Sequence, residues 1–173
     1  QKAFALPPGL AFAVASEGFL ARAATVPDRG LYFDLAEFAA FARRSQTPNT
    51  PALPLLFALE AQLAAMAREG IESRWARHEA MRARVERWAE DPGSPLEILA
   101  RPGGRSATVT ALSLRVGVSA AAVVEAMRQR GYVIGAGYGK LRDVSIRIGH
   151  MGDHTLTGLD RCLDELGAAL GAT

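Results

Sequence analysis

The sequence predicts an α/β chain, with helices over most of the first ninety residues and a small α+β domain after them. Two neighbouring segments, 53–69 and 71–90, carry apolar residues at helical spacing and meet at Gly70. Residues 91–95 read Asp-Pro-Gly-Ser-Pro and mark the clearest boundary in the chain. Beyond it, short apolar segments typical of strands alternate with two helical segments, which predicts an antiparallel sheet covered by helices.

The composition excludes several classes of protein. Of the 173 residues, 49% are hydrophobic and 22% are charged, which is typical of a globular chain and not of a disordered one. Cys162 is the only cysteine, so a disulfide scaffold is excluded. No apolar run reaches the roughly 18 residues of a membrane span, and the first residues lack a signal-peptide pattern, so we expect a cytoplasmic protein without a membrane partner.

The charge points to no nucleic-acid partner, because the net charge is only +2. Of the twenty basic residues, only Lys2 and Lys140 are lysines. This bias towards arginine is typical of a GC-rich coding background and is not evidence of function. The chain opens at Gln1 without an initiator Met, and we expect a fragment or a processed product.

The segments before the two long helices predict one strand and two short helices. The continuous apolar run 10–15 favours a strand that is buried on both faces, as in a parallel sheet. Ser16 is expected to cap a helix over 17–24. Apolar spacing within 31–44 predicts another helix, which the segment 45–51, Ser-Gln-Thr-Pro-Asn-Thr-Pro, interrupts.

The segments after the boundary follow the order strand, strand, helix, strand, strand, helix. This order predicts a small sandwich of helices on an antiparallel sheet. The expected elements are strands at 96–99, 108–114, 132–134 and 144–148, a helix capped by Ser119 through about Gln129 and closed by Gly131, and a helix capped by Thr155 through about Leu170.

Lys2 is the first candidate for chemistry. It lies beside a Pro-Pro-Gly turn that leads into the predicted strand. A rigid position and partial burial would lower the pKa of its amine, as an amine that forms a Schiff base requires. The residues alone also allow a solvated lysine at a frayed terminus, and they favour that alternative.

Two further segments leave alternatives open. The hydroxyls and free backbone N–H groups of Thr47-Pro48-Asn49-Thr50 suit either an anion site or a helix cap. Arg147 lies in the apolar strand segment 144–148. It can face water, pair with an acid, or bind a carboxylate through two parallel hydrogen bonds.

Other features favour structural interpretations. The segment 135–139 lacks the Lys-Ser/Thr of a nucleotide loop and predicts a flexible connection. His78, His150 and His154 have no metal-ligand spacing, and the last two are expected at the surface. The arginines of 74–87 alternate with glutamates, which is typical of a solvated helix. Cys162 shares a helical spacing with Leu159 and Leu166, which favours a core position.

The start of the chain, Gln1-Lys2 followed after six residues by Gly9-Leu10-Ala11, resembles the pyridoxal-phosphate attachment motif of the class V aminotransferases. It is most similar to the alanine–glyoxylate and serine–pyruvate branch, which includes the serine–glyoxylate enzymes. The resemblance covers nearly all 173 residues, because further segments fall in the order and spacing of the family: Leu31–Leu35 with its helix, Thr47–Pro51, Glu69–Trp75, Ile146–Gly149 and the segment from Thr155.

The resemblance implies a fold-type-I pyridoxal-phosphate-dependent transferase, of which this chain is the C-terminal half. Residues 1–30 would close the large cofactor domain, 31–92 would form linking and dimer-contact helices, and 93–173 would form the small domain. The missing N-terminal half would supply the acid that pairs with the pyridine nitrogen, the aromatic ring stacked on the cofactor, and most of the phosphate cup.

The resemblance also assigns roles to residues. It implies that Lys2 captures pyridoxal 5'-phosphate and then shuttles a proton, and that Gln1 bonds the cofactor phosphate. Thr50 and Thr47 would reach the phosphate of the neighbouring subunit of a homodimer, although related enzymes often carry Tyr at the position of Thr47. Arg147 would hold the α-carboxylate of the amino acid, and no metal is implied.

The expected reaction is ping-pong transfer of the amino group of alanine or serine to glyoxylate or pyruvate. A sister class V aminotransferase that acts on phosphoserine, aspartate or ureidoglycine is the alternative within the family. Outside it, a non-catalytic α+β binding domain remains open, as does a helical nucleic-acid-binding module that uses the arginines of 74–87.

Overall fold

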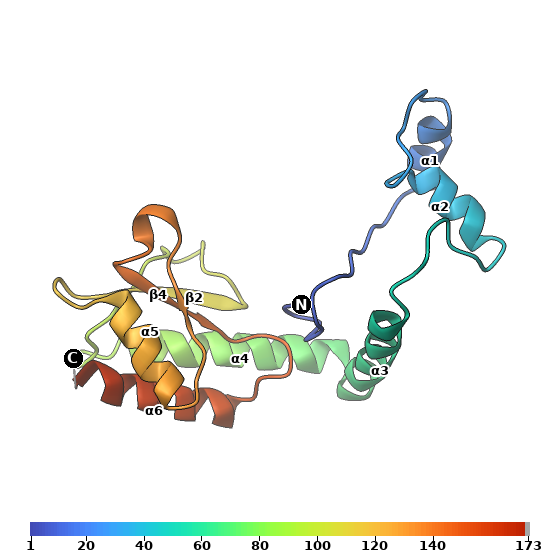
Figure 1. Ribbon diagram of the computed structural model, residues 1–173. Coiled ribbons are helices and arrows are strands. Elements are labelled where there is room, and N and C mark those ends of the chain that lie inside the picture. Colours follow the sequence, from blue (N-terminus) through green and yellow to red (C-terminus); the bar gives the residue numbers. More distant parts are fainter. Residues whose placement is uncertain (172–173) are drawn as a thin grey trace. The chain divides into compact units, whose positions relative to one another are not determined.

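The computed structural model describes residues 1–171, which form two compact units (Figure 1). The first unit comprises residue 1 and residues 6–61, and the second comprises residues 2–5 and everything from residue 62 onward. The expected division at residues 30 and 92 concerns roles in a whole enzyme and stays a prediction. Within residues 1–171, no helix combines the length and the apolar character that crossing a bilayer requires.

The first unit contains two short helices, close to their expected positions. Helix α1 spans Glu17–Ala24, and the Ser16 hydroxyl caps it by accepting a hydrogen bond from the Phe19 N–H at 3.2 Å. Helix α2 spans Leu35–Ala42, and the Asp34 carboxylate caps it. The first helix therefore confirms its predicted bounds, and the second is shorter than the expected segment 31–44.

The expected strand at residues 10–15 is wrong, because this segment has no regular secondary structure. Phe12 and Val14 are exposed within it. An apolar run becomes a buried strand only when neighbouring strands pair with its backbone. Within the described residues, every paired strand belongs to the sheet formed between residues 97 and 149.

Two long helices follow, and both confirm the sequence analysis. Helix α3 spans Leu53–Glu69 and helix α4 spans Ile71–Ala89. Gly70 separates them with a φ of +83°, a backbone conformation that suits glycine. This break brings Glu69, the last residue of α3, close to side chains on the first turns of α4.

The second unit contains an antiparallel sheet of four strands in the order β1-β2-β4-β3, as the strand and helix order predicts. The strands are β1 (Glu97–Ile98), β2 (Val109–Ser113), β3 (Gly135–Ala136) and β4 (Ser145–Gly149). Between them and after them lie α5 (Ala120–Gln129), the 3-10 turn η1 (Gly139–Leu141) and α6 (Leu156–Gly171).

Strand β3 differs from its expected position at 132–134. After α5, the Tyr132 N–H bonds back to the Met127 carbonyl at 2.9 Å, so Tyr132 still closes the helix. Pairing with β4 begins only at Gly135, which lies opposite Arg147. The segment expected to be a flexible loop therefore contributes a strand and η1.

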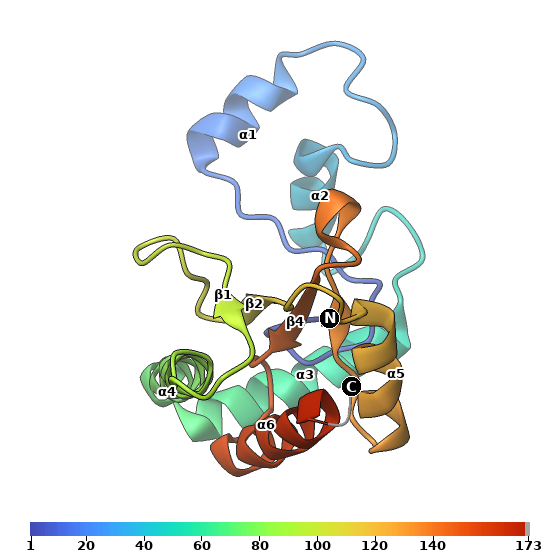
Figure 2. The same ribbon diagram turned by 90° about the vertical axis from the view of Figure 1, so that its left-hand side faces the viewer.

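Helices α4 and α5 pack against the sheet, and α6 packs against both of these helices. Together they enclose the core of the second unit (Figures 1 and 2). Leu112 on β2 pairs with Ile146 on β4, and both side chains are fully buried. The apolar side chains that these helices contribute are Met81, Val85, Ala89, Ala120, Val123, Met127, Leu159, Leu163, Leu166 and Ala169. Because side chains alternate along a strand, Arg147 points away from this core.

Candidate active site

Lys2 belongs to a tight turn at residues 2–5, which is part of the second unit. The Lys2 carbonyl accepts a hydrogen bond from the Ala5 N–H at 2.9 Å. A Cβ at Gly152 would come within 3.1 Å of the Lys2 carbonyl oxygen, so the turn lies directly on that glycine. The Lys2 side chain is exposed, so its expected partial burial is not observed in these residues. The fixed part is the backbone, and the amine projects from it.

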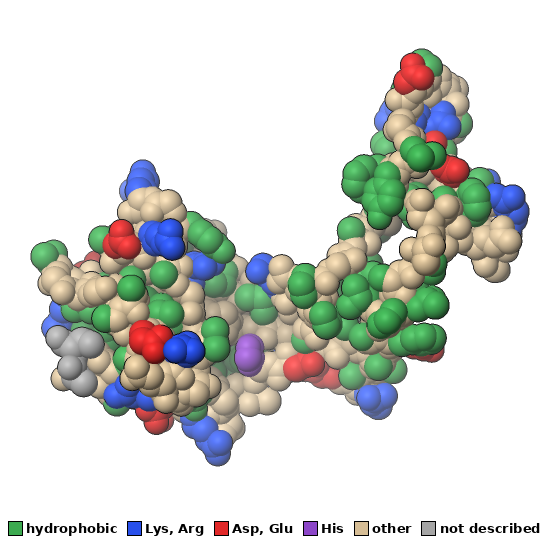
Figure 3. Space-filling model, in the orientation of Figure 1, with side chains coloured by type: hydrophobic (Ala, Val, Ile, Leu, Met, Phe, Trp, Pro, Cys, Tyr) green, Lys and Arg blue, Asp and Glu red, His purple; other side chains and the backbone are tan. Residues whose placement is uncertain are grey.

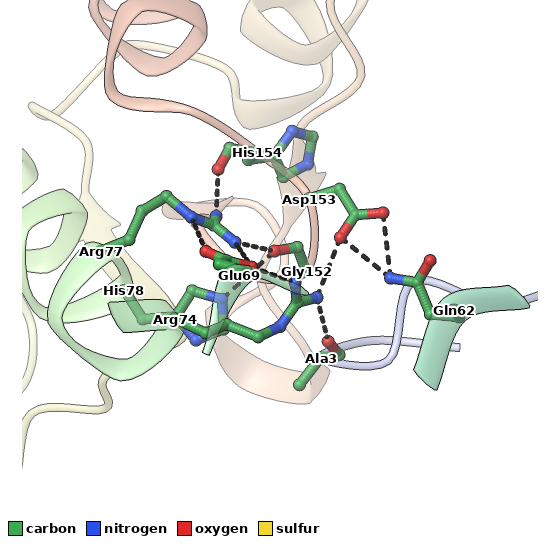
Figure 4. Close-up of polar contacts among 9 residues, drawn as sticks. All are labelled: Ala3, Gln62, Glu69, Arg74, Arg77, His78, Gly152, Asp153 and His154. Atoms are coloured by element: carbon green, nitrogen blue, oxygen red, sulfur yellow. Dashed lines mark hydrogen bonds and ion pairs between the residues drawn. The ribbon is translucent and has the colours of Figure 1, made fainter. Parts of the chain in front are cut away.

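A buried arginine ties this turn to the loop that follows β4 (Figure 4). Arg74, on the first turn of α4, donates from Nη2 to the Ala3 carbonyl and to Asp153 Oδ1, each at 2.9 Å. Its Nη1 donates to Glu69 Oε2 at 2.8 Å. Asp153 also accepts two hydrogen bonds from the Gln62 amide. One guanidinium therefore joins the turn, the α3–α4 junction and the β4 loop.

Arg77 reinforces the same junction. It donates to both oxygens of Glu69, at 2.7 and 3.0 Å, and to the carbonyls of Gly152 and His154. The hydrogen bonds from Arg77, together with those from Arg74, lower the pKa of Glu69 to about 2. Glu69 is thus a carboxylate at every pH at which the protein would work, and it keeps both arginines in place.

Arg147 lies on β4, six residues before the Asp153 that Arg74 binds. It is half-buried, and its Nε donates to the Ala136 carbonyl on β3 at 2.7 Å. Its guanidinium carbon lies 4.0 Å from the centre of the Tyr138 ring, a cation–π contact. Within residues 1–171, no carboxylate pairs with Arg147, and its Nη1 and Nη2 have no hydrogen-bond partner.

The position of Arg147 depends on the absence of a side chain at Gly135. A Cβ there would lie 2.9 Å from Arg147 Nη2, closer than carbon atoms approach such groups. The guanidinium therefore lies across β3, held at Nε and on one face, with its two terminal nitrogens open. This geometry matches a fork that takes a carboxylate through two parallel hydrogen bonds.

The remaining predicted site residues are all exposed. Thr47 donates its hydroxyl hydrogen to the Asn49 carbonyl at 2.8 Å, within its own loop. Thr50 and Gln1 have no side-chain hydrogen bond within the described part of the chain. These three residues belong to the first unit, whereas Lys2 and Arg147 belong to the second. The structure brings together the turn of Lys2 and the loop after Arg147.

The surface position expected for His150 is wrong. Its side chain is fully buried, and its Nε2 lies 2.8 Å from the Thr110 hydroxyl, while Nδ1 has no partner within the described residues. Burial lowers the pKa of His150. His78 is also buried and bonds the Gly152 carbonyl, whereas His154 is exposed, as expected. No group of three potential metal ligands occurs within residues 1–171.

Cys162 is half-buried beside the core, and burial raises the pKa of its thiol. Both facts agree with the core interpretation and not with a nucleophile, which requires a thiolate.

The sequence pattern does not single out Arg74, because Arg74 lies in a helix whose alternating arginines and glutamates are typical of a solvated surface. It is only 3% exposed. A signal was present in its spacing, since the buried residues of α4 are Arg74, His78, Met81, Val85 and Ala89. These intervals of four and three residues place Arg74 on the core-facing side of the helix. Tyr138 was missed too, because the sequence does not show that it stacks on Arg147.

Comparison with known proteins gives consistent relatives, although no family model matches the chain. An uncharacterized aminotransferase of Methanocaldococcus jannaschii is 33% identical over 96% of this chain and 46% of its own length. The serine–glyoxylate aminotransferase of Methylorubrum extorquens is 33% identical over 99% of this chain and 42% of its own length. The chain thus spans about half the length of the curated relatives it matches.

A solved structure agrees with these relatives. The ureidoglycine–glyoxylate aminotransferase of Bacillus subtilis superposes with a TM-score of 0.88 at 25% identity. The match covers 99% of this chain and 45% of that chain. The fold of both units is therefore similar to part of that aminotransferase.

Proposed function

Because this chain belongs to the class V aminotransferase family, we propose that the whole protein moves the amino group of alanine or serine to glyoxylate or pyruvate. The observation that carries the proposal is the bridge that Arg74 forms, within one unit, between the turn of Lys2 and the loop after the strand of Arg147. In this proposal, the connection holds the Lys2 amine and the Arg147 guanidinium, which would bind a carboxylate, in the same unit.

The residues present fit pyridoxal 5'-phosphate, the cofactor of this family. The Lys2 amine is exposed and has no ion pair or hydrogen bond within residues 1–171, so it is available to a carbonyl group. When bound, the cofactor supplies an aldehyde that takes up amino groups and a ring that stabilises negative charge on the substrate carbon. Lys2 holds the cofactor, and its amine then moves the proton of the substrate α-carbon.

Three other residues are proposed to contact the cofactor phosphate. The Gln1 amide and the Thr50 hydroxyl both keep free donors. Thr47 has given its only hydroxyl hydrogen to the Asn49 carbonyl, so it fits a phosphate less well than Thr50 does. Following the family, we assign Thr50 and Thr47 to the site of the neighbouring subunit, which makes the protein a homodimer.

Arg147 is proposed to bind the α-carboxylate of the amino acid and of the 2-oxo acid. Its Nη1 and Nη2 are the donors, while the Ala136 carbonyl and the Tyr138 ring keep the guanidinium in one plane. Both half-reactions use substrates with this carboxylate, so one fork serves both. Selectivity between alanine and serine would come from the walls of the pocket around the side chain.

The alternatives have less support. A sister enzyme for phosphoserine, aspartate or ureidoglycine would use the same Lys2 and Arg147, and it would differ only in its preferred substrate. A non-catalytic α+β domain would give no reason for the unpaired guanidinium of Arg147 and the exposed amine of Lys2 to occur in the same unit. The cytoplasmic location expected from the sequence stays a prediction.

The test is borohydride reduction of the purified full-length protein in the presence of pyridoxal phosphate, followed by peptide mass mapping. We expect a pyridoxyl-phosphate adduct on Lys2 and none on Lys140, the other lysine of this chain. Lys2→Ala should abolish the adduct and lower alanine–glyoxylate transamination by at least about a hundredfold. Lys140→Ala is the matched control and should change neither.

Two results would contradict the proposal. One is the absence of an adduct on Lys2 with the cofactor in excess. The other is full transaminase activity in the Lys2→Ala variant. Either would favour a binding domain that has the fold of these enzymes without their chemistry.

A further inference from the structure

We propose that Arg74 is a positioning residue for Lys2. Arg74 fixes the turn of Lys2, and with it the catalytic amine, relative to the guanidinium of Arg147 that binds the substrate carboxylate. This inference rests on the proposed function, because it assumes that Lys2 and Arg147 act on one substrate. Arg74 touches neither substrate nor cofactor in this proposal. It acts through the Ala3 carbonyl, the first backbone acceptor after Lys2.

The bond to Ala3 is made by a guanidinium that cannot easily move. Arg74 is 3% exposed, and a buried charge is tolerated only when partners surround it. Glu69 and Asp153 supply two carboxylate partners, at 2.8 and 2.9 Å. With both in place, the remaining hydrogen of Nη2 points at the Ala3 carbonyl.

The other end of the connection is equally fixed. Gly152 has a φ of +70°, and its carbonyl accepts hydrogen bonds from Arg77 at 3.1 Å and from His78 at 3.3 Å. These bonds hold the β4 loop on α4, one residue before Asp153. Because β4 runs directly into this loop, the position of Asp153 follows the position of the strand that carries Arg147.

Loss of Arg74 should affect the turn of Lys2 more than the rest of this hydrogen-bond network. Without Arg74, Glu69 would keep its hydrogen bonds from Arg77, and Asp153 would keep those from Gln62. The Ala3 carbonyl is the one acceptor of Arg74 for which no second partner is found within residues 1–171. The turn of Lys2 is therefore where the change should be felt.

Lysine should not replace Arg74. An ammonium group is a compact charge, whereas the planar guanidinium reaches three acceptors on two of its nitrogens at once. An Arg74→Lys variant keeps the charge and tests the geometry. An Arg74→Met variant removes both the charge and the hydrogen bonds while it keeps an unbranched side chain.

Arg84 provides the matched control. It lies on the same helix and pairs with Asp160 of α6 at 2.6 Å, and it makes no bond to the turn at residues 2–5. Arg84→Met therefore removes an arginine and an ion pair from α4 without touching Lys2. Comparing the two variants separates a positioning effect from a general loss of stability.

The first measurement is amide hydrogen exchange in the full-length protein, and it does not depend on catalysis. The Ala5 N–H is bonded to the Lys2 carbonyl, so its protection reports on the turn. In Arg74→Met we expect this protection to fall by about tenfold, as the loss of a hydrogen bond to a charged donor predicts. Arg84→Met should leave it unchanged.

The second measurement is steady-state kinetics of the cofactor-loaded enzyme. We expect kcat to fall by about 10- to 100-fold in both Arg74 variants, because the amine is displaced from the reacting carbon. KM for the amino acid should stay within about threefold, because Arg147 is untouched. The proposal would be overturned if the Arg74 variants kept a normal kcat and lost only as much thermal stability as Arg84→Met does.

The outcomes for the two proposals can be told apart. If borohydride labels Lys2 but the Arg74 variants keep normal Ala5 exchange and kcat, the positioning role is wrong and the proposed function stands. If exchange at Ala5 rises but Lys2 is never labelled, Arg74 fixes the turn without serving the proposed chemistry, and the positioning role also falls. Should Arg74→Met fail to fold, Arg74→Lys decides by the same criteria.

Discussion

Arg147 illustrates how much a site residue depends on its immediate neighbours. Three neighbours fix the position of its guanidinium within the apolar strand. The Ala136 carbonyl takes Nε, the Tyr138 ring covers one face of the guanidinium, and Gly135 leaves room for Nη2. Each of these neighbours lies on or beside β3, so a short strand of two residues determines where the fork points.

Gly135→Ala tests this arrangement. The added methyl group should push the Arg147 guanidinium aside, because it would lie 2.9 Å from Nη2, and the tip of a side chain moves more easily than backbone. We expect KM for the amino acid to rise by about tenfold, as the loss of a hydrogen bond to a charged group predicts. Thermal stability should change little.

The control for this substitution is Gly104→Ala. A Cβ at Gly104 would meet its nearest neighbour, the Arg101 carbonyl, at an ordinary 3.6 Å. Equal KM values for Gly135→Ala and Gly104→Ala would show that Arg147 does not need the space above Gly135.

At the scale of elements, a buried histidine joins two strands and a helix at one end of the sheet. The backbone N–H of His150 donates to the Thr108 carbonyl, and the imidazole Nε2 lies within hydrogen-bond distance of the Thr110 hydroxyl on β2. Burial is the main reason why a protonated His150 is disfavoured, and the charge of Arg82 on α4 disfavours it further. The neutral ring is therefore the form that the packing of β2, β4 and α4 requires.

This burial predicts how stability depends on pH. The folded pKa of His150 lies below its unfolded value of 6.5, so only the unfolded chain gains a proton as the pH first falls below that value. The stabilisation by neutral His150 is complete above about pH 6.5 and is lost as the pH falls towards the folded pKa. The thermal midpoint should therefore decrease as the pH is lowered from about 7.5 to about 5.

Two variants assign this pH dependence. His150→Gln should flatten the decrease in the thermal midpoint, because no group at this position would then titrate. His154→Gln, which changes an exposed histidine four residues away, should keep it. An equally steep decrease in His150→Gln and in the parent protein would place the titrating group elsewhere.

At the scale of the whole molecule, α3 exposes an unusual amount of apolar surface. It contains no buried residue, although hydrophobic side chains gather over it (Figure 3). Phe57 is 67% exposed, and Leu53, Leu56 and Leu63 are exposed as well. An exposed apolar surface of this kind is typical of a protein–protein contact. This agrees with the proposed homodimer, in which residues 31–92 form the contacts.

Phe57→Glu should therefore weaken the dimer. Burying an unpaired carboxylate in an apolar interface costs desolvation free energy that no new interaction offsets. We therefore expect the dissociation constant of the dimer to rise by at least about tenfold. Sedimentation velocity of the full-length protein over a range of concentrations measures it. Val116→Glu, a change at a fully exposed residue of the second unit, is the control and should leave assembly unchanged.

An unchanged dimer in Phe57→Glu would mean that another part of the same protein covers α3. The surface would then be a contact within one subunit, and the sharing of Thr50 between subunits would lose its support from this helix.

What the sequence determined by itself is mainly local. The ends of α1 and α5 follow from the caps at Ser16 and Ser119, because a cap bonds N–H groups only a few residues away. The order of strands and helices after residue 95 follows from periodicity in the same way. The motif around Lys2 and the position of Arg147 also lie within short segments, so the resemblance to the family was visible without coordinates.

Only the tertiary structure decided which groups are buried and which backbones pair. The run at 10–15 has a strand pattern but no pairing partner here, and β3 begins where Gly135 meets Arg147. Arg74 and His150 looked like surface residues, yet residues distant in sequence enclose them. Burial and strand pairing are properties of segments far apart in the chain, so no local pattern determines them.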